Sequence, residues 1–280
     1  MLLCIVLKQD NSHPIGIFDS GIGGLTVANA IAKRLPNESF IYFGDTAHLP
    51  YGDKSAEAIK HYSKKIASFL QSQQCKMVVI ACNTASAVGY KTLLSQFEDK
   101  ELLINVIDPV VEHVRDRVGK GKVGIIGTKR TVSTRSYSKK IKSLAPHLQT
   151  TELATPLLAP MIEEGYFNNN ISQTIINDYL SKKPLANIDA LILACTHYPL
   201  IQGQVEKYYK QEKRNIPIVD SANVVAQKVE QVLKQKSMLY IGKDKPAYRF
   251  YVSDYTTSFE NTAKIFFHEK IRLEYYPMWQ

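Results

Sequence analysis

Two cysteines occupy closely similar settings in the two halves of this sequence. Cys82 follows the apolar run 77–81 and precedes the polar Asn83, and Cys195 follows the apolar run 190–194 and precedes the polar Thr196. A thiol at the end of a buried strand, near the positive end of a following helix, is expected to have a lowered pKa and to form thiolate readily. Each cysteine alone fits a buried structural role equally well. The matched pair favours two thiols that exchange protons with one substrate.

The other two cysteines lack this setting. Cys4 lies near the N-terminus, and Cys75 stands among Gln73, Gln74 and Lys76. Four scattered cysteines without a Cys-x-x-Cys pair exclude a disulfide scaffold and give no sign of a zinc or thioredoxin-type motif. We therefore expect free thiols in a reducing compartment, no bound metal, and no chemical role for Cys4 or Cys75.

Carboxylate and imidazole groups stand near the predicted thiol sites. The glycine-rich segment DSGIGGLT begins with Asp19 and Ser20 directly after an apolar run. It lacks the glycine spacing of a dinucleotide site and the lysine of a P-loop. Asp19 can orient a thiol or receive an ammonium group, and its alternative role is a helix cap. His197 lies two residues after Cys195, where an imidazole can protonate the sulfur or hold its thiolate, although a lone histidine is more often structural.

The segment GDTAHLPYG, residues 44–52, has the composition of a rigid turn. Such a turn could offer backbone groups and the phenol of Tyr51 to a cleft. On its own, the segment fits an ordinary well-formed turn equally well.

The elements that position these residues show an alternation of short apolar runs with longer amphipathic segments. Runs rich in β-branched residues between helical segments are typical of parallel sheets covered by helices on both faces. The sequence therefore predicts an α/β fold with eight strands, at residues 15–18, 40–43, 77–81, 103–107, 123–126, 150–154, 190–193 and 216–219.

The eight predicted strands fall into two similar sets of four. PIGIFDSGIGG matches KVGIIGTKRT in hydrophobic pattern, MVVIACNTAS matches ALILACTHYP, and INVIDPVVEHV matches IPIVDSANVVA. Such internal similarity indicates a duplication. Two related α/β halves that meet at the carboxyl ends of their strands would place Cys82 and Cys195 on opposite walls of one cleft. A substrate with two mirror-image forms suits that arrangement.

We therefore expect two pseudo-symmetric parallel-sheet domains with the active site between them. A chain of 280 residues is long enough for two such domains. The expected lobes are residues 1–103 with 217–280, which carry Asp19, Tyr51 and Cys82, and residues 104–216, which carry Cys195 and His197. Residues 1–13 are expected to form a disordered or appended tail.

Composition excludes several classes of function. No run approaches the roughly 20 apolar residues of a membrane span, and the start MLLCIVL lacks the basic residues and cleavage site of a signal peptide. The formal net charge is +9, but the lysines are spread along helical segments rather than gathered in a stripe with exposed aromatics. We expect a cytoplasmic protein without membrane contact and without a nucleic-acid site.

Together these motifs resemble the glutamate racemases of the aspartate/glutamate racemase superfamily. DSGIGGLT, GDTAHLPYG, ACNTAS, GTKRTV, PLLAPMIEEG and ACTHYP occur in the family's order and span nearly all of the chain from Pro14. The resemblance implies two α/β lobes with the substrate between them. It also implies racemisation of L-glutamate to D-glutamate for peptidoglycan synthesis, with neither pyridoxal phosphate nor a metal.

The resemblance further assigns roles to individual residues. It implies Cys82 and Cys195 as the proton-transfer residues, with Asp19 and His197 tuning them, and it implies that Cys82 takes the proton of the D-isomer and Cys195 that of the L-isomer. The residues implied to line the substrate are Asp19, Ser20, Tyr51, Gly52, Asn83, Thr84, Thr196 and His197. Further assignments are Pro50, Thr131 as a carboxylate contact, and Glu164 as a polar group near His197.

The sequence departs from the family's pattern at Ala194, where glycine usually precedes the second cysteine, and at its N-terminal residues and aromatic end 275–280.

The alternatives to a glutamate racemase are an aspartate racemase and a non-catalytic small-anion binding module on the same fold. In aspartate racemases the pattern at the second cysteine resembles Cys-Thr-Glu rather than Cys-Thr-His, so His197 favours glutamate as the substrate. A monomer and a homo-oligomer such as a dimer both stay open. Contact with a DNA topoisomerase, which some family members bind, is not favoured by this sequence.

Overall fold

The computed structural model describes residues 11–255, 259–260, 263, 267 and 272–280, and its strands form two sheets in which all pairings are parallel. The first sheet contains β1 (Ile15–Asp19), β2 (Phe40–Gly44), β3 (Met77–Ile80), β4 (Leu103–Asn105), β9 (Tyr248–Val252) and β10 (Leu273–Tyr275). The second contains β5 (Gly121–Gly127), β6 (Leu148–Ala154), β7 (Ala190–Ala194) and β8 (Ile218–Asp220). The predicted α/β fold with two parallel sheets is confirmed.

The two sheets repeat one strand order. The order is β10-β9-β2-β1-β3-β4 in the first sheet and β6-β5-β7-β8 in the second, so the first four strands of each set are arranged alike. This repetition agrees with the internal similarity of the sequence. Strands β9 and β10 extend the first sheet beyond β2, and neither was among the eight predicted strands. A run such as YRFYV, with a charged residue inside it, lacks the continuous apolar pattern of a buried parallel strand.

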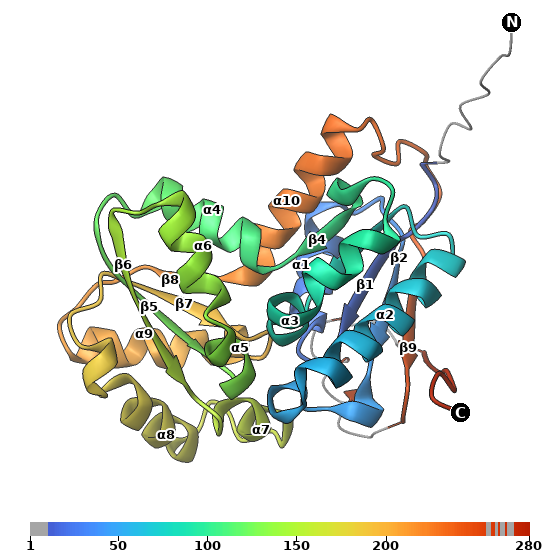
Figure 1. Ribbon diagram of the computed structural model, residues 1–280. Coiled ribbons are helices and arrows are strands. Elements are labelled where there is room, and N and C mark those ends of the chain that lie inside the picture. The colour runs from blue at the N-terminus through green and yellow to red at the C-terminus, as the bar shows by residue number, and fades with distance from the viewer. Residues whose placement is uncertain (1–10, 256–258, 261–262, 264–266, 268–271) are drawn as a thin grey trace, which may run out of the picture.

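Helices cover both sheets, and one of them joins the two lobes. Within the described residues the helices are α1 (Leu25–Arg34), α2 (Ala56–Ser72), α3 (Asn83–Leu93), α4 (Ile107–Arg117), α5 (Lys129–Thr134), α6 (Ser136–Leu144), α7 (Leu158–Glu163), α8 (Asn170–Leu180), α9 (Gln202–Gln211) and α10 (Ser221–Gln235). Figure 1 shows the lobes side by side, with α10 leading from the second sheet back to the first. Helix α10 packs on α1 and α4, and Glu230 of α10 lies 2.6 Å from Arg34 of α1.

The alternation of side chains along each strand decides which way the cysteines face. Cys82 belongs to the same hydrophobic cluster as positions 78 and 80 of β3, and Cys195 to the same cluster as positions 191 and 193 of β7. The intervening positions of both strands belong to a third cluster, which also contains residues of α1, α4 and α10. Because side chains alternate between faces with a period of two, both cysteines leave their sheets on the side away from that shared core.

One predicted strand end and one predicted lobe boundary are wrong. The strand expected at 103–107 ends at Asn105, because Asn105 Oδ1 accepts the amide hydrogens of Ile107 and Asp108 and so begins α4. The second crossing between lobes, expected at 217, lies later, since β8 pairs with β7 in the second sheet. An apolar run predicts a strand but does not say which sheet the strand joins.

The prediction of an N-terminal tail at residues 1–13 is contradicted at its last three residues. Residues 1–10, with Cys4, lie outside the described residues. Asn11 donates to the carbonyl oxygen of Ser237 at 3.0 Å, and its own carbonyl oxygen accepts from Lys76 Nζ at 2.7 Å. Residues 11–13 therefore belong to the folded protein, contrary to the expectation for 1–13.

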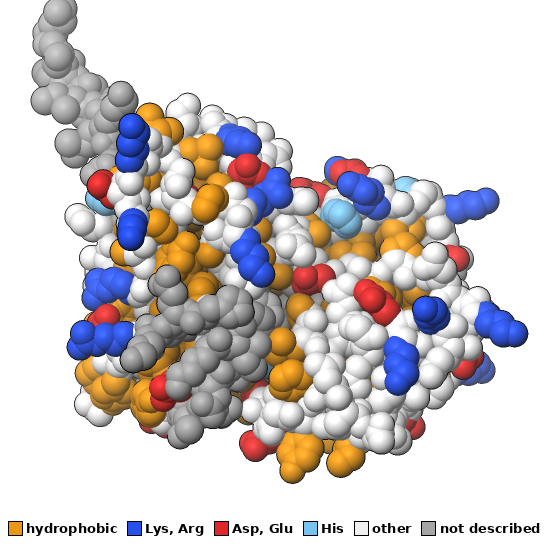
Figure 2. Space-filling model, turned by 180° about the vertical axis from the view of Figure 1, so that it is seen from behind, with side chains coloured by type: hydrophobic (Ala, Val, Ile, Leu, Met, Phe, Trp, Pro, Cys, Tyr) orange, Lys and Arg blue, Asp and Glu red, His pale blue; other side chains and the backbone are white. Residues whose placement is uncertain are grey.

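In the part of the chain that the structure describes, no helix combines the length and apolar character that a membrane span requires. On the face drawn in Figure 2, Lys and Arg side chains are scattered rather than joined in a stripe.

Candidate active site

Cys82 caps the helix that follows it. It is the N-cap residue of α3, and its sulfur accepts the amide hydrogen of Ala85 at 3.3 Å. The thiol donates to Ser20 Oγ, 3.7 Å away. Burial raises the pKa of Cys82 to about 12, with a further upward contribution from Asp19, while the Ala85 amide and Ser20 act in the opposite direction. The lowered pKa expected from the helix end is therefore wrong for Cys82, because desolvation outweighs the helix amide.

Cys195 stands beside an imidazole. It follows β7, and a 3₁₀ turn at Tyr198–Ile201 separates it from α9. Its sulfur lies 3.5 Å from His197 Nδ1, and His197 Nε2 lies 3.0 Å from Glu163 Oε1. Burial lowers the pKa of His197, but hydrogen bonds to Cys195 and Glu163 raise that pKa by more, to well above its ordinary value. A charged imidazole next to Cys195 stabilises negative charge on the sulfur.

The acidic partner of His197 is Glu163 and not the predicted Glu164. Glu163 is the last residue of α7 and is half-buried, whereas Glu164 follows the helix and is exposed. Adjacent residues at a helix end point about 100° apart, so the two carboxylates cannot face His197 together. The Glu163-Glu164 run predicts an acidic group near His197 but does not tell which of the two supplies it.

Asp19 forms a hydrogen bond to the second lobe. Its carboxyl group is fully buried, with Oδ2 accepting from the Gly21 amide at 3.1 Å and Oδ1 accepting from the Thr196 hydroxyl at 3.3 Å. Burial raises the pKa of Asp19, and the charge of His197 and two backbone amides oppose that rise. Asp19 is thus coupled electrostatically to Cys82 and to His197 at once.

The two cysteine turns lie close enough to influence each other. Cys195 contributes to the raised pKa of Cys82. The loop after β1 lies directly against the second turn, because a Cβ on Gly23 would stand 2.4 Å from Thr196 Oγ1 and 2.7 Å from His197 Nδ1. Only glycine permits this approach, which explains why the loop after Asp19 is glycine-rich.

The turn at residues 50–52 reaches the second lobe through its glycine. A Cβ on Gly52 would lie 2.9 Å from Thr128 Cβ. Pro50 is half-buried and precedes the 3₁₀ turn that begins at Tyr51. The Tyr51 phenol is buried and donates to Asp45 Oδ2 at 2.6 Å. Burial raises the pKa of Tyr51 well above its ordinary value, and Asp45, Cys82 and Asp19 add to that rise.

Amide and hydroxyl groups from both lobes meet just after the first cysteine. The Tyr137 hydroxyl donates to Asn83 Oδ1 at 2.6 Å, and Asn83 Nδ2 is buried with no hydrogen-bond partner in the described part of the chain. The Thr84 hydroxyl lies 3.0 Å from that of Thr128 and 3.1 Å from that of Thr131. These groups can bind a carboxylate or a developing negative charge. Tyr137 lies outside the motifs of the sequence, and Thr128, although it lies within GTKRTV, was not among the predicted site residues.

The structure gathers most of the predicted site residues in one buried region between the lobes. Those joined there by the contacts above are Asp19, Ser20, Cys82, Asn83, Thr84, Thr131, Cys195, Thr196 and His197. Cys75 has a free thiol and makes none of these contacts. Two buried thiols, one beside a charged imidazole, can pass a proton between the two faces of a small molecule.

Comparison with known proteins agrees with this arrangement. The sequence model of the family described as Asp/Glu/Hydantoin racemase matches residues 25–229. A glutamate racemase from Caldanaerobacter subterraneus subsp. tengcongensis is 38% identical over 258 residues, which are 92% of this chain and 92% of that protein.

Solved structures show the same similarity. Glutamate racemase from Francisella tularensis subsp. tularensis, solved in complex with D-glutamate, has a TM-score of 0.88 at 33% identity and covers 96% of this chain and 99% of its own. A glutamate racemase isoform from Bacillus anthracis has a TM-score of 0.86 at 31% identity, with coverage of 95% and 98%. The similarity therefore extends over both lobes.

Proposed function

The chain belongs to the Asp/Glu/Hydantoin racemase family, and from that premise we propose that it interconverts L- and D-glutamate through Cys82 and Cys195. As a member of this family it is an amino-acid racemase. The observation that carries the proposal is the pair of buried thiols that follow equivalent strands of two repeated sheets. The full-length glutamate racemase relatives and His197 support glutamate as the substrate. The product would supply D-glutamate for peptidoglycan in the cytoplasm.

The unlike surroundings of the two cysteines suit this reaction. Racemisation needs a base on one face of the α-carbon and an acid on the other. Burial raises the pKa of Cys82 and favours its thiol form, and the charged imidazole of His197 lies 3.5 Å from the Cys195 sulfur. In the proposed starting state, Cys82 is a thiol and Cys195 is a thiolate. In this state the Cys195 thiolate takes the α-proton of L-glutamate and the Cys82 thiol delivers a proton to the opposite face. The result is a thiolate at Cys82 and a thiol at Cys195, which is the state that D-glutamate requires.

Between the two transfers, negative charge develops at the α-carbon and its carboxylate. Preorganised donors in a site without bulk water stabilise such charge, and each is worth about 3 kcal/mol. Asn83 Nδ2 and the hydroxyl of Thr84 are donors near Cys82, and Cys82 and Cys195 are only 4% and 5% exposed. The proposal therefore needs neither pyridoxal phosphate nor a metal.

The test is a circular-dichroism assay of the purified protein with L-glutamate, D-glutamate and L-aspartate, with a chelator and no added cofactor. We expect the signal of both glutamate enantiomers to decay to zero and that of L-aspartate to persist. Faster decay with L-aspartate would instead identify an aspartate racemase. Glutamate binding that survives alkylation of the thiols, with no racemisation, would identify a non-catalytic binding module.

A further inference from the structure

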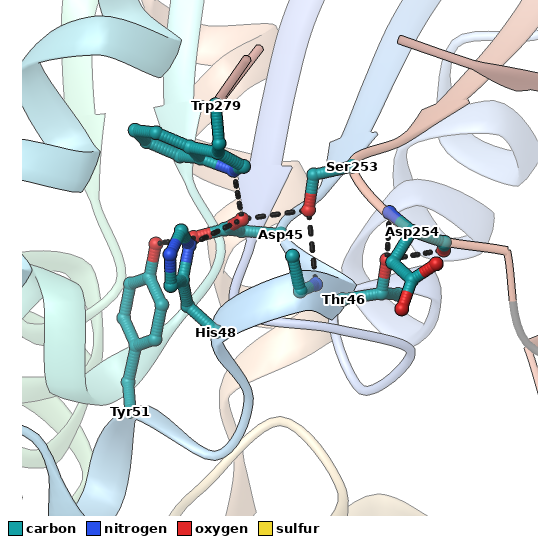
Figure 3. Close-up of polar contacts among 8 residues, drawn as sticks. Asp45, Thr46, His48, Tyr51, Ser253, Asp254 and Trp279 are labelled. Atoms are coloured by element: carbon teal, nitrogen blue, oxygen red, sulfur yellow. Dashed lines mark hydrogen bonds and ion pairs between the residues drawn. The ribbon is translucent and has the colours of Figure 1, made fainter. Parts of the chain in front are cut away.

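A buried carboxyl group outside the cysteine site collects four donors. Asp45, which follows β2, is fully buried. Its Oδ2 accepts from the Tyr51 hydroxyl at 2.6 Å and lies 3.0 Å from His48 Nδ1. Its Oδ1 accepts from Ser253 Oγ at 2.7 Å and from Trp279 Nε1 at 2.8 Å (Figure 3). A carboxylate in the protein interior requires hydrogen-bond donors of this kind, because an unpaired buried charge costs several kcal/mol.

The four donors come from three separate parts of the chain. Tyr51 and His48 belong to the same loop as Asp45, Ser253 follows β9, and Trp279 is the penultimate residue (Figure 3). The indole N–H is a donor only, so Trp279 recognises Asp45 as an acceptor. The aromatic end of the sequence, which departs from the family's pattern, thus has a defined place in the fold.

Packing holds Trp279 in that place. Strand β10 pairs with β9, and the Tyr276 amide donates to the carbonyl oxygen of Val252 at 2.9 Å. The Trp279 ring contacts that of His48 edge-on, with ring centroids 4.6 Å apart, and that of Tyr62, with centroids 5.1 Å apart. Trp279 packs against the same hydrophobic cluster that contains Tyr51 and Cys82.

We propose that Trp279 is a positioning residue for the racemase site, acting through Asp45 and Tyr51 on the turn at residues 50–52. Asp45 connects the Trp279 indole directly to the Tyr51 phenol. Gly52, next along the chain, lies so close to the second lobe that a Cβ on it would stand 2.9 Å from Thr128 Cβ. Loss of the indole N–H leaves Asp45 with one donor fewer and loosens the turn that closes against the second lobe. This inference rests on the proposed function, since glutamate is the substrate whose binding the turn would support.

The experiment compares Trp279→Phe, Tyr51→Phe and their double variant with the wild type. Trp279→Phe keeps an aromatic ring on His48 and Tyr62 but removes the N–H. We expect its KM for both glutamate enantiomers to rise about tenfold with kcat nearly unchanged, the size expected for one hydrogen bond to a charged group. KM does not depend on how much of the protein is folded, so a merely structural loss would lower the apparent kcat instead.

The double variant tests whether Trp279 acts through Asp45 and Tyr51. If it does, Trp279→Phe adds little to KM when the Tyr51 hydroxyl is already absent. The matched control is Tyr275→Phe, which removes a different hydrogen bond of the C-terminal segment. That bond runs from Gln280 Nε2 to the exposed Tyr275 hydroxyl and does not involve Asp45. An unchanged KM in Trp279→Phe, or effects of the two variants that simply multiply, would overturn the inference.

A second measurement needs no catalysis. Trp279 is the only tryptophan in the sequence, so tryptophan fluorescence reports on this contact alone. We expect acrylamide to quench it weakly in the wild type and more strongly in Asp45→Ala, which removes the acceptor. Quenching in the wild type equal to that of free N-acetyltryptophanamide would overturn the inference even in an active racemase. An inactive wild type whose Trp279 is protected, and is exposed by Asp45→Ala, would refute the proposed function but support the link from Trp279 to Asp45.

Discussion

The two cysteine turns are alike in sequence and unlike in surroundings. Both follow a buried strand, yet the residue two places after the cysteine is Thr84 in the first turn and His197 in the second. Cys82 caps an α-helix and forms hydrogen bonds with the Ala85 amide and the Ser20 hydroxyl. Cys195 instead faces an imidazole that is itself paired with a carboxylate.

This difference shows how a duplicated architecture can give two like groups unlike surroundings. The repeated sheets place the thiols in equivalent positions, and the side chains added to each turn decide which groups each thiol faces. The asymmetry cannot favour one product, because two enantiomers have equal free energy and kcat/KM must be the same in both directions. It has to appear in the individual proton transfers, where the following variants can detect it.

Replacing either thiol should have the largest effect. We expect Cys82→Ser and Cys195→Ser each to lower racemisation about 10³-fold or more, because a serine hydroxyl is a much weaker acid than a thiol. In heavy water, Cys82→Ser should exchange only the α-hydrogen of L-glutamate and Cys195→Ser only that of D-glutamate, as NMR would show. Cys75→Ser is the control and should keep full activity. Wild-type-like exchange of both enantiomers by either single variant would end the two-thiol mechanism.

Removing His197 should separate the two turns. In a Cys82→Ser background, His197→Asn should slow exchange of L-glutamate about 10²-fold, because Cys195 loses its charged neighbour. In a Cys195→Ser background the same change should slow exchange of D-glutamate only about threefold, since Cys82 has no contact with the imidazole. Equal slowing in both backgrounds would mean that His197 serves both thiols and that the imidazole does not distinguish the two turns.

Glu163→Gln should act in the same direction but less strongly. Glu163 raises the pKa of His197, so its replacement lowers that pKa, and the charged imidazole is then lost at a lower pH. The alkaline limb of kcat for L-glutamate should therefore move to lower pH, with kcat about tenfold lower at neutral pH. The matched control is Glu164→Gln, whose side chain is exposed and whose pH profile should equal that of the wild type. A shift of similar size in the control would return the assignment to Glu164.

The smallest effect is expected at Thr84, the counterpart of His197 in the first turn. Thr84→Val keeps the shape but removes hydrogen bonds to Thr128 and Thr131 across the lobes. We expect the free energy of unfolding in urea to fall by about 1 kcal/mol and KM to rise about threefold. Thr174→Val, at an exposed position of α8, is the control and should change neither quantity. A large fall in kcat for Thr84→Val would show that this hydroxyl takes part in the proton transfers.

Much of the fold was predictable because its signals are local. Local patterns marked eight of the ten strands in the described residues, mostly as apolar runs, although β6 has Glu152 inside it. The repeated motifs marked the duplication. Strand β9, with Arg249 inside it, and the three-residue β10 have no such signal. The strand at 103–107 was predicted too long because Asn105 begins a helix through its side chain, which hydrophobic pattern does not reveal.

The candidate site was predictable in part for the same reason. Motifs identified both cysteines, Asp19 and His197, because these residues stand at fixed offsets from buried strands. They did not tell whether Glu163 or Glu164 pairs with His197, nor did they indicate that Asp45 would accept a hydrogen bond from the Tyr51 phenol. Those outcomes depend on which side chains from distant segments meet.

The sequence by itself determined that two matched thiols end two matched strands, because a strand and the turn after it are set by their own residues. Only the tertiary structure decided what surrounds each thiol. Burial, which raises the pKa of Cys82 against the effect of its helix, exists only once both lobes exclude water. The partners of His197 and Asp45 likewise come from α7 and from the end of the chain, far away in sequence and adjacent only in the folded protein.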